Sequence, residues 1–71
     1  MLHYDFEKRN ELSKYEYLYR CLKEDIVTGR IAQGSRMPSK RTLAEDNGIS
    51  IRTVLNAYNQ LLVEGYLESR E

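Results

Sequence analysis

The chain has 71 residues, of which 41% are hydrophobic and 31% charged, with eleven basic and eleven acidic side chains. This length allows one small domain with a modest core, and the composition is that of a globular protein rather than a disordered one. Because the charges cancel, the net charge by itself points to no class of partner.

The charges are unevenly distributed along the chain. Residues 30–52 carry five basic side chains against two acidic ones, whereas the segments before and after them carry more acidic than basic groups. The five are Arg30, Arg36, Lys40, Arg41 and Arg52. The middle of the chain is therefore basic and its ends are not.

The single cysteine, Cys21, excludes an intrachain disulfide and favours a reducing, intracellular setting. The chain opens without a charged-then-apolar leader, and no apolar run approaches the roughly 20 residues that a membrane span needs. We expect a soluble, cytoplasmic domain with no membrane partner.

The first twelve residues mix aromatic and charged side chains without a sustained period. They predict a lead-in over residues 1–12, partly extended around Tyr4 and Phe6, followed by one domain over residues 13–71. His3 stands alone in this segment, without the neighbouring His or Cys ligands of a metal site.

The start and end of a first helix are well marked. Ser13 and Glu16 have the spacing of a capping box, in which each side chain binds the backbone N–H of the other residue. Apolar side chains then recur at helical spacing until Gly29, which suits the left-handed position after a helix. They are Tyr15, Leu18, Tyr19, Leu22 and Ile26. The pattern predicts a helix over about residues 14–28.

Residues 30–37 contain Gly34 and show no helical period. We expect a loop that ends in a short extended β piece at Arg36 and Met37. The bias against helix of a residue that precedes proline agrees with this interpretation.

A short second helix is predicted over about residues 40–46. Ser39 is its candidate N-cap, and Leu43 and Ala44 form its buried face. An Asn-Gly turn dipeptide follows at residues 47–48.

Ser50 is the candidate N-cap of a third helix, which ends at about residue 64, before Gly65. At about 100° per residue, its apolar side chains gather on one side and form the predicted core face. They are Val54, Ala57, Tyr58 and Leu61. Residues 66–70 read as a short strand, with Tyr66 anchored on the core. The predicted fold class is mainly α: a three-helix winged helix-turn-helix with a short β piece and a truncated wing.

The opposite side of the third helix is polar and has no carboxylate before Glu64. It holds Arg52, Asn56, Asn59 and Gln60, with Thr53 at its edge. Such side chains can hydrogen-bond base edges in the major groove of DNA, where an acid would be repelled by phosphate. A neutral polar surface that arose by chance explains this helix alone equally well.

The start of the second helix carries Lys40 and Arg41 beside free backbone N–H groups, which suits a DNA phosphate. Taken alone, two ordinary surface cations are the simpler interpretation. Together with the polar third helix, across a turn of helix-turn-helix length, they favour DNA binding.

The stretch "IVTGRIAQGSRMPSKRTLAEDNGISIRTVLNAYNQLLVEGYL" resembles the N-terminal winged helix-turn-helix of the GntR family of bacterial transcription regulators. The shared patterns are I-x-x-G-x-(I/L)-x-x-G, then (L/M)-P-S-x-R-x-L-A, then G-(V/I)-S-x-x-T-V, and finally L-x-x-E-G-(Y/L)-(L/I). The resemblance implies DNA contacts from Ser39, Arg41, Ser50, Arg52 and Thr53.

The sequence departs from the family at two positions. Many relatives have arginine or another polar residue where this chain has Ile51 and Leu55. We therefore expect base reading to rest on Arg52, Thr53 and Asn56, with Ile51 against a thymine methyl group.

Within the family, the tyrosine-rich "KYEYLYRCLKEDIVTG" and the stretch "TVLNAYNQLLVEGYLESR" look most like the MocR subgroup. Members of that subgroup carry a C-terminal domain resembling a fold-type I aminotransferase that binds pyridoxal phosphate. The resemblance implies that the wing is cut short, with Arg70 on its first strand as a further DNA contact. It also implies that the effector domain and the homodimer contacts lie in a C-terminal part absent here.

We find no cluster of residues for catalysis, metal binding or cofactor binding in this chain, and Cys21 reads as a small helix residue at the core edge. The main alternative function is a winged-helix protein-interaction module without DNA binding. Such a module would more often show an apolar patch on the third helix. The parent protein could be a pyridoxal phosphate-binding regulator or a simpler effector-binding one.

Overall fold

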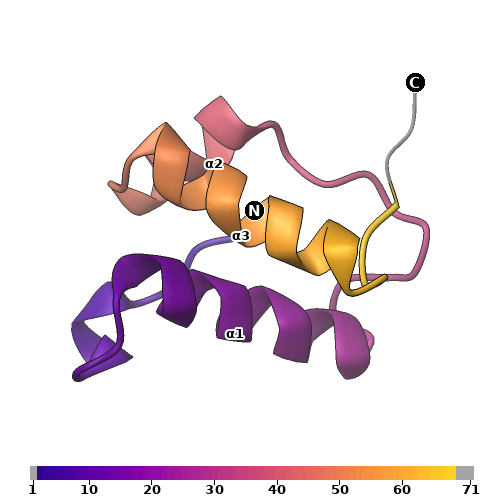
Figure 1. Cartoon of the computed structure of the whole chain (residues 1–71), viewed down its shortest axis with the longest axis horizontal. Helices are drawn as coiled ribbons and strands as arrows, with labels where there is room; N and C mark the ends of the chain where they lie inside the picture. Colours follow the sequence, from indigo (N-terminus) through magenta and orange to yellow (C-terminus); the bar gives the residue numbers. More distant parts are fainter. Residues whose placement is uncertain (1, 69–71) are drawn as a thin grey trace.

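The computed structural model describes residues 2–68, which form three α-helices and one turn of 3₁₀ helix (Figure 1). The 3₁₀ turn η1 spans Phe6–Arg9, and the α-helices are α1 (Lys14–Val27), α2 (Lys40–Asn47) and α3 (Ile51–Val63). The predicted mainly α, three-helix class is confirmed, and each predicted helix boundary is correct to within one residue.

The predicted β pieces are wrong for the described residues, because residues 2–68 contain no strand. After α3, the backbone N–H groups of Tyr66 and Leu67 both donate to the carbonyl of Leu61, at 2.9 and 3.3 Å. These bonds turn the chain back onto the end of α3 instead of extending it. The segment at Arg36 and Met37 has no neighbouring strand in the described part with which to form a ladder. Residues 69 and 70 of the predicted wing lie outside the described residues.

Helix α1 begins where its capping sequence predicts. The Ser13 hydroxyl accepts a hydrogen bond from the backbone N–H of Glu16 at 3.1 Å. In a full capping box the Glu16 carboxylate would bind the backbone N–H of Ser13. Here it forms an ion pair with the Arg20 guanidinium one turn later, with 3.6 Å between nitrogen and oxygen. After the helix, Gly29 adopts a φ of 85°, as predicted for a left-handed residue.

The core lies between the three helices and consists mainly of aliphatic side chains. Its fully buried members are Leu18, Leu22, Leu43, Ala44, Val54, Ala57 and Leu61, with Ile31 and Tyr58 nearly so. All four predicted core residues of α3 are confirmed. On α1, Tyr15, Tyr19 and Ile26 are half-buried and pack against this core rather than within it.

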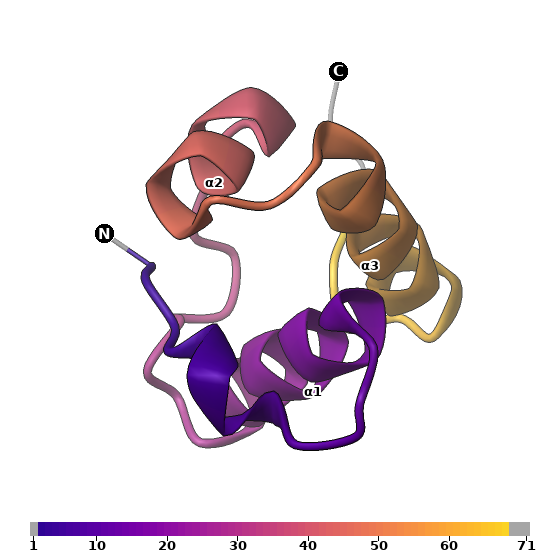
Figure 2. The same ribbon diagram turned by 90° about the vertical axis from the view of Figure 1, so that its left-hand side faces the viewer.

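Helix α3 is the central element, since both α1 and α2 pack on it directly. Seen along the helices, α1, α3 and α2 surround the core, and the N-terminal segment runs between α1 and α2 (Figure 2). The sequence predicted an extended segment around Phe6, but Phe6 instead begins the 3₁₀ turn η1. The Asp5 carboxylate accepts from the backbone N–H of Glu7 at 3.0 Å and caps the 3₁₀ turn that begins at Phe6.

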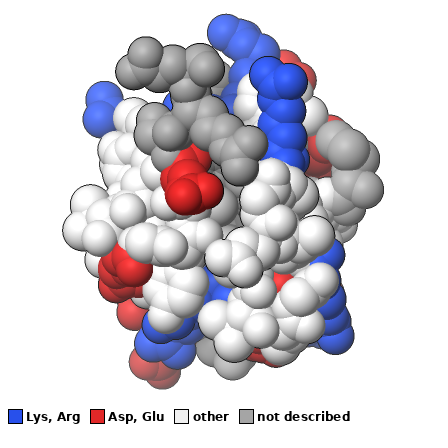
Figure 3. Space-filling view, turned by 90° about the vertical axis from the view of Figure 1, so that its right-hand side faces the viewer, with Lys and Arg blue, Asp and Glu red and all other residues white. Residues whose placement is uncertain are grey.

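The end of the molecule where α1 and α3 finish is largely uncharged (Figure 3). Val27 and Val63 are 65% and 82% exposed there. Beside them, a groove of about 610 Å³ runs between the loop before α2 and the turn after α3, with Met37, Tyr58 and Tyr66 among its lining residues. The groove reaches Lys40 at the start of α2, whereas the start of α3 lies at the opposite end of that helix.

Candidate nucleic-acid interface

The start of α2 presents two cations beside a capped helix end. The Ser39 hydroxyl accepts from the backbone N–H of Thr42 at 3.1 Å and donates to the Thr42 hydroxyl at 2.8 Å. Lys40 and Arg41 are exposed, and neither forms an ion pair within residues 2–68. Both charges are thus available at the positive end of the helix dipole, which favours an anionic oxygen.

The start of α3 repeats this arrangement. The Ser50 hydroxyl accepts from the backbone N–H of Thr53 at 3.1 Å and lies 2.8 Å from the Thr53 hydroxyl. Thr53 is half-buried, so its methyl and hydroxyl groups are held close to the helix. Arg52 is exposed and has no ion-pair partner in the described part of the chain. Its guanidinium is therefore free for a bidentate contact.

The exposed face of α3 is narrower than the sequence pattern indicates. Arg52, Asn56 and Asn59 are exposed as predicted. Gln60 is instead half-buried, and its amide donates to the Glu64 carboxylate at 2.9 Å. The same carboxylate accepts a hydrogen bond from the Tyr19 hydroxyl of α1. Gln60 and Glu64 thus belong to the contact between α1 and α3.

The electrostatics of that contact keep the nearest acid charged and bound. The hydrogen bond from Tyr19 lowers the pKa of Glu64, and the bond from Gln60 lowers it further. The Lys23 ammonium group lies over the Tyr19 ring, 5.7 Å from its centroid. The carboxylate is therefore held toward α1 rather than standing free on the polar face.

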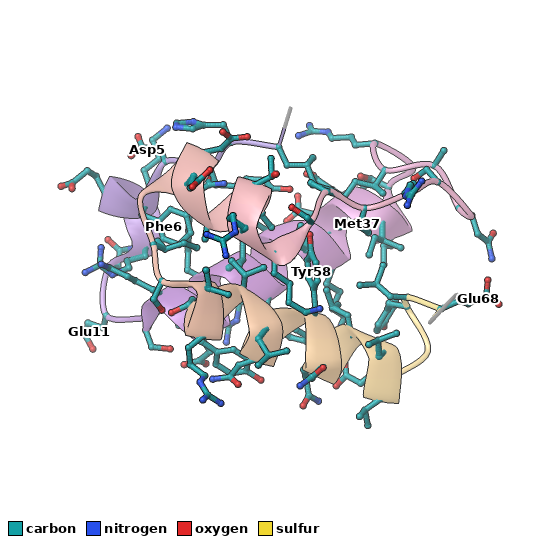
Figure 4. All side chains as sticks on the ribbon, turned by 90° about the horizontal axis from the view of Figure 1, so that it is seen from above. Asp5, Phe6, Glu11, Met37, Tyr58 and Glu68 are labelled. Carbon is teal, nitrogen blue, oxygen red and sulfur yellow. The ribbon has the colours of Figure 1, made fainter. Side chains whose placement is uncertain are left out.

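The positions of α2 and α3 relative to each other are fixed by a side chain of the core. Tyr58, at the centre of the molecule (Figure 4), donates from its hydroxyl to the backbone carbonyl of Pro38 at 2.8 Å. Burial raises the pKa of Tyr58 to about 12, so the group remains a donor at neutral pH. The bond joins α3 to the residue just before the Ser39 cap.

At its other end α2 is joined to α3 by a tight turn. Gly48 adopts a left-handed φ of 64°, as the Asn-Gly dipeptide predicts. The side chain of Asn47 just before it receives one hydrogen bond and donates two. The sequence suggested only a turn residue here, and the importance of Asn47 was missed because its partners are distant in sequence.

The structure therefore places the predicted binding residues in two groups, each at one helix start. The group on α2 comprises Ser39, Lys40 and Arg41. The group on α3 comprises Ser50, Ile51, Arg52, Thr53 and Asn56. The remaining candidate, Arg70, lies outside the described residues.

Other chemistry finds little support among residues 2–68. Cys21 is half-buried at the core edge, and burial raises the pKa of its thiol. No group of three or more His, Cys, Asp or Glu side chains in this range could hold a metal ion. None of the helices described is long and apolar enough to cross a membrane.

Comparison with known proteins decides the family. Residues 14–71 match the sequence pattern of the bacterial regulatory proteins of the gntR family. The chain belongs to the GntR family. Its helix-turn-helix is a DNA-binding domain of the kind found in bacterial transcription regulators, as the sequence indicated.

Several relatives are similar over most of this chain. It is 47% identical over 60 residues to the uncharacterized HTH-type transcriptional regulator YdeL of Bacillus subtilis, covering 84% of this chain and 13% of that protein. It is 41% identical over 64 residues to YhdI of the same organism, covering 90% of this chain and 14% of that one. The probable rhizopine catabolism regulatory protein MocR of Rhizobium meliloti is 42% identical over 60 residues, covering 84% of this chain and 12% of MocR. The MocR-like resemblance is therefore confirmed, and the chain spans only a small part of these relatives.

Proposed function

We propose that this GntR domain places the N-terminal half of α3 in the major groove of DNA while the start of α2 binds the phosphate backbone. Arg52 reads a base, because it is exposed in the first turn of α3, where a recognition helix meets base edges. Asn56 follows one turn later on the same exposed face and supplies an amide for adenine. Ile51 contacts a thymine methyl group.

The other proposed contact residues bind the phosphate backbone of the DNA rather than its bases. Lys40 and Arg41 neutralise phosphate, and the Ser39 and Ser50 hydroxyls stand at the two helix starts where phosphate oxygens are expected. Thr53 lies at the edge of the α3 face and orients Ser50 through the hydroxyl pair. Arg70 is proposed as a contact from the wing.

The observation that carries this proposal is that two capped helix starts each carry cations that form no ion pair within residues 2–68. The turn between Asn47 and Ile51 joins the end of α2 directly to the start of α3, and the Tyr58–Pro38 bond ties the residue before the α2 cap to the second half of α3. A protein-interaction module would more often present an apolar patch here. Ile51, 44% exposed, is the one large hydrophobic side chain of the first two turns of α3 that is exposed among the described residues.

The test separates base reading from phosphate binding. A duplex is selected from a random library with this chain at low salt, and affinities for it and for a scrambled duplex are titrated at two salt concentrations. Arg52→Ala is expected to cost about 1–3 kcal/mol on the selected duplex only. Lys40→Ala is expected to weaken both duplexes alike and to reduce the salt dependence.

Arg20→Ala serves as the matched control, because it removes an exposed arginine from α1, outside the proposed interface. It is expected to leave both affinities unchanged. Equal losses on both duplexes for Arg52→Ala would contradict its base-reading role. Failure of the wild-type chain to enrich any duplex sequence would contradict sequence-specific binding.

We further infer that the chain is the DNA-binding part of a longer regulator. In that regulator residues 13–71 belong to a winged helix-turn-helix, and residues 1–12 precede it. Dimer formation and any effector domain lie in another part of the protein, and in a MocR-like regulator that part would bind pyridoxal phosphate. The small share of each relative that this chain covers supports this inference. The relatives' names as regulators support a binding role in the cytoplasm rather than catalysis.

A further inference from the structure

The segment before α1 is bonded to the far end of the helix-turn-helix. The backbone N–H of Tyr4 donates to the Asn47 side-chain oxygen at 2.8 Å. The Asn47 amide donates in return to the carbonyl of Leu2 at 3.1 Å and to that of Leu43, within α2, at 2.9 Å. One side chain thus joins residues 2–4 to the last turn of α2, across more than forty residues of sequence.

The same segment is also fixed to α1. The Tyr4 hydroxyl donates to the buried Asp25 carboxylate at 2.7 Å, and burial together with this bond raises the pKa of Tyr4. Further along, the Tyr17 hydroxyl donates to the backbone carbonyl of Asp5 at 2.8 Å. The Phe6 ring meets the Tyr17 ring edge-on, with centroids 5.0 Å apart. Residues 4–6 are therefore attached to α1 near both ends of that helix.

These contacts lie where the helices themselves meet least. Helices α1 and α2 each pack on α3 and approach each other much less closely. The N-terminal segment runs along the side of the molecule between α1 and α2 (Figure 2). Leu2, Tyr4 and Phe6 also pack against the core there. The family match begins only at residue 14, so residues 2–9 lie outside the part of the chain that the family pattern covers, whereas their partners on α1 and α2 lie within it.

We propose that residues 2–9 form a strap that fixes α2 against α1 and so holds the start of α2 in its DNA-binding position. This inference rests on the proposed function, since it concerns how the two helix starts face DNA. Helix α2 has only eight residues and is held at its N-terminal end by the Tyr58–Pro38 bond. Asn47, on the strap side, holds its C-terminal end. Asn47 and Tyr4 are thus positioning residues that act on Lys40 and Arg41 through α2 without touching DNA.

The expected consequence of releasing the strap is local motion of α2. A helix that leaves its competent position for part of the time lowers the apparent affinity by the fraction of time lost. Local opening also speeds amide hydrogen exchange in the released element before the rest of the molecule is affected. A contribution to stability alone would change exchange in all three helices together.

The experiment compares Tyr4→Ala, Asn47→Ala and the double variant with Ile26→Ala as control, at a temperature where circular dichroism shows every variant fully folded. Ile26→Ala weakens packing on α1 without touching the strap. Tyr4→Ala and Asn47→Ala are expected to speed exchange of α2 amides more than α3 amides and to weaken binding of the selected duplex roughly fivefold. The double variant should be little worse than the more severe single one, because the two substitutions break one link at its two ends: Tyr4→Ala removes the bond to Asp25 of α1, and Asn47→Ala removes the bonds that join residues 2–4 to α2. Ile26→Ala should keep wild-type affinity.

If Tyr4→Ala fails to fold, Tyr4→Phe, which loses only the bond to Asp25, replaces it and is judged by the same criteria. Uniform exchange across the three helices, or wild-type affinity in both strap variants, would overturn the proposal. A wild-type chain that binds no duplex would instead contradict the proposed function, and the exchange measurements would still test the strap.

Discussion

Among the single side chains that we propose to read DNA, Ile51 is the most distinctive. A thymine differs from uracil only in its C5-methyl group, so replacing each thymine of the selected duplex by deoxyuridine tests for a methyl contact. We expect one replacement to cost wild-type protein about 0.8 kcal/mol, the value of one buried methylene-sized group. Ile51→Ala should bind more weakly and be insensitive to that replacement.

Val63→Ala is the matched control for Ile51→Ala, because it shortens an exposed aliphatic side chain at the opposite end of α3. It should retain the wild-type response to deoxyuridine. A variant Ile51→Ala that remains sensitive at the same thymine would show that another residue makes the methyl contact.

At the scale of elements, the packing of α1 should dominate the stability of the domain. Leu22 is fully buried, whereas Ile26 is half-buried beside the groove. We expect Leu22→Ala to lower the free energy of unfolding by about 2–5 kcal/mol and Ile26→Ala to fall at or below the lower end of that range. Thermal melts of the two variants measure the difference. Equal midpoints would mean that the groove side of α1 is as well packed as the core.

The contact between α1 and α3 should also respond to acid. Because the Tyr19 hydrogen bond lowers the folded-state pKa of Glu64 below 4.5, this contact stabilises the fold above pH 4.5. Its contribution is lost as the pH falls through the lowered folded-state pKa. Tyr19→Phe should therefore cost stability at neutral pH and progressively less on acidification. Tyr15→Phe, on the same helix face, should show no such trend; a parallel trend would place the effect elsewhere.

At the scale of the whole molecule, the chain should bind DNA weakly and mainly as a monomer. A helix-turn-helix monomer reads one half-site, and most of the apolar side chains of this one belong to a small core. Joining two copies can raise avidity by about 10²–10⁴, a gain that requires dimer contacts which we place outside this chain. Analytical ultracentrifugation with and without the selected duplex measures both properties. A stable dimer at micromolar concentration, or nanomolar binding at physiological salt, would contradict this expectation.

Local sequence alone determined most of the secondary structure. Ser13, Ser39 and Ser50 each cap a helix as predicted, because an N-cap depends only on a side chain and the backbone N–H groups a few residues later. The core face of α3 was equally predictable, since helical periodicity places its members on one side. The family and the two helix starts followed from the same stretch of sequence.

Tertiary structure decided what depends on partners distant in the chain. Gln60 does not belong to the exposed polar face, because its amide binds the Glu64 carboxylate, which the Tyr19 hydroxyl holds at the contact between α1 and α3. Asn47 looked like a turn residue, and only the folded chain brings the backbone of the first few residues to its side chain. Periodicity and capping report on neighbours within one or two turns, whereas the bonds of Tyr19 to Glu64 and of Asn47 to residues 2 and 4 join groups that meet only when the helices pack.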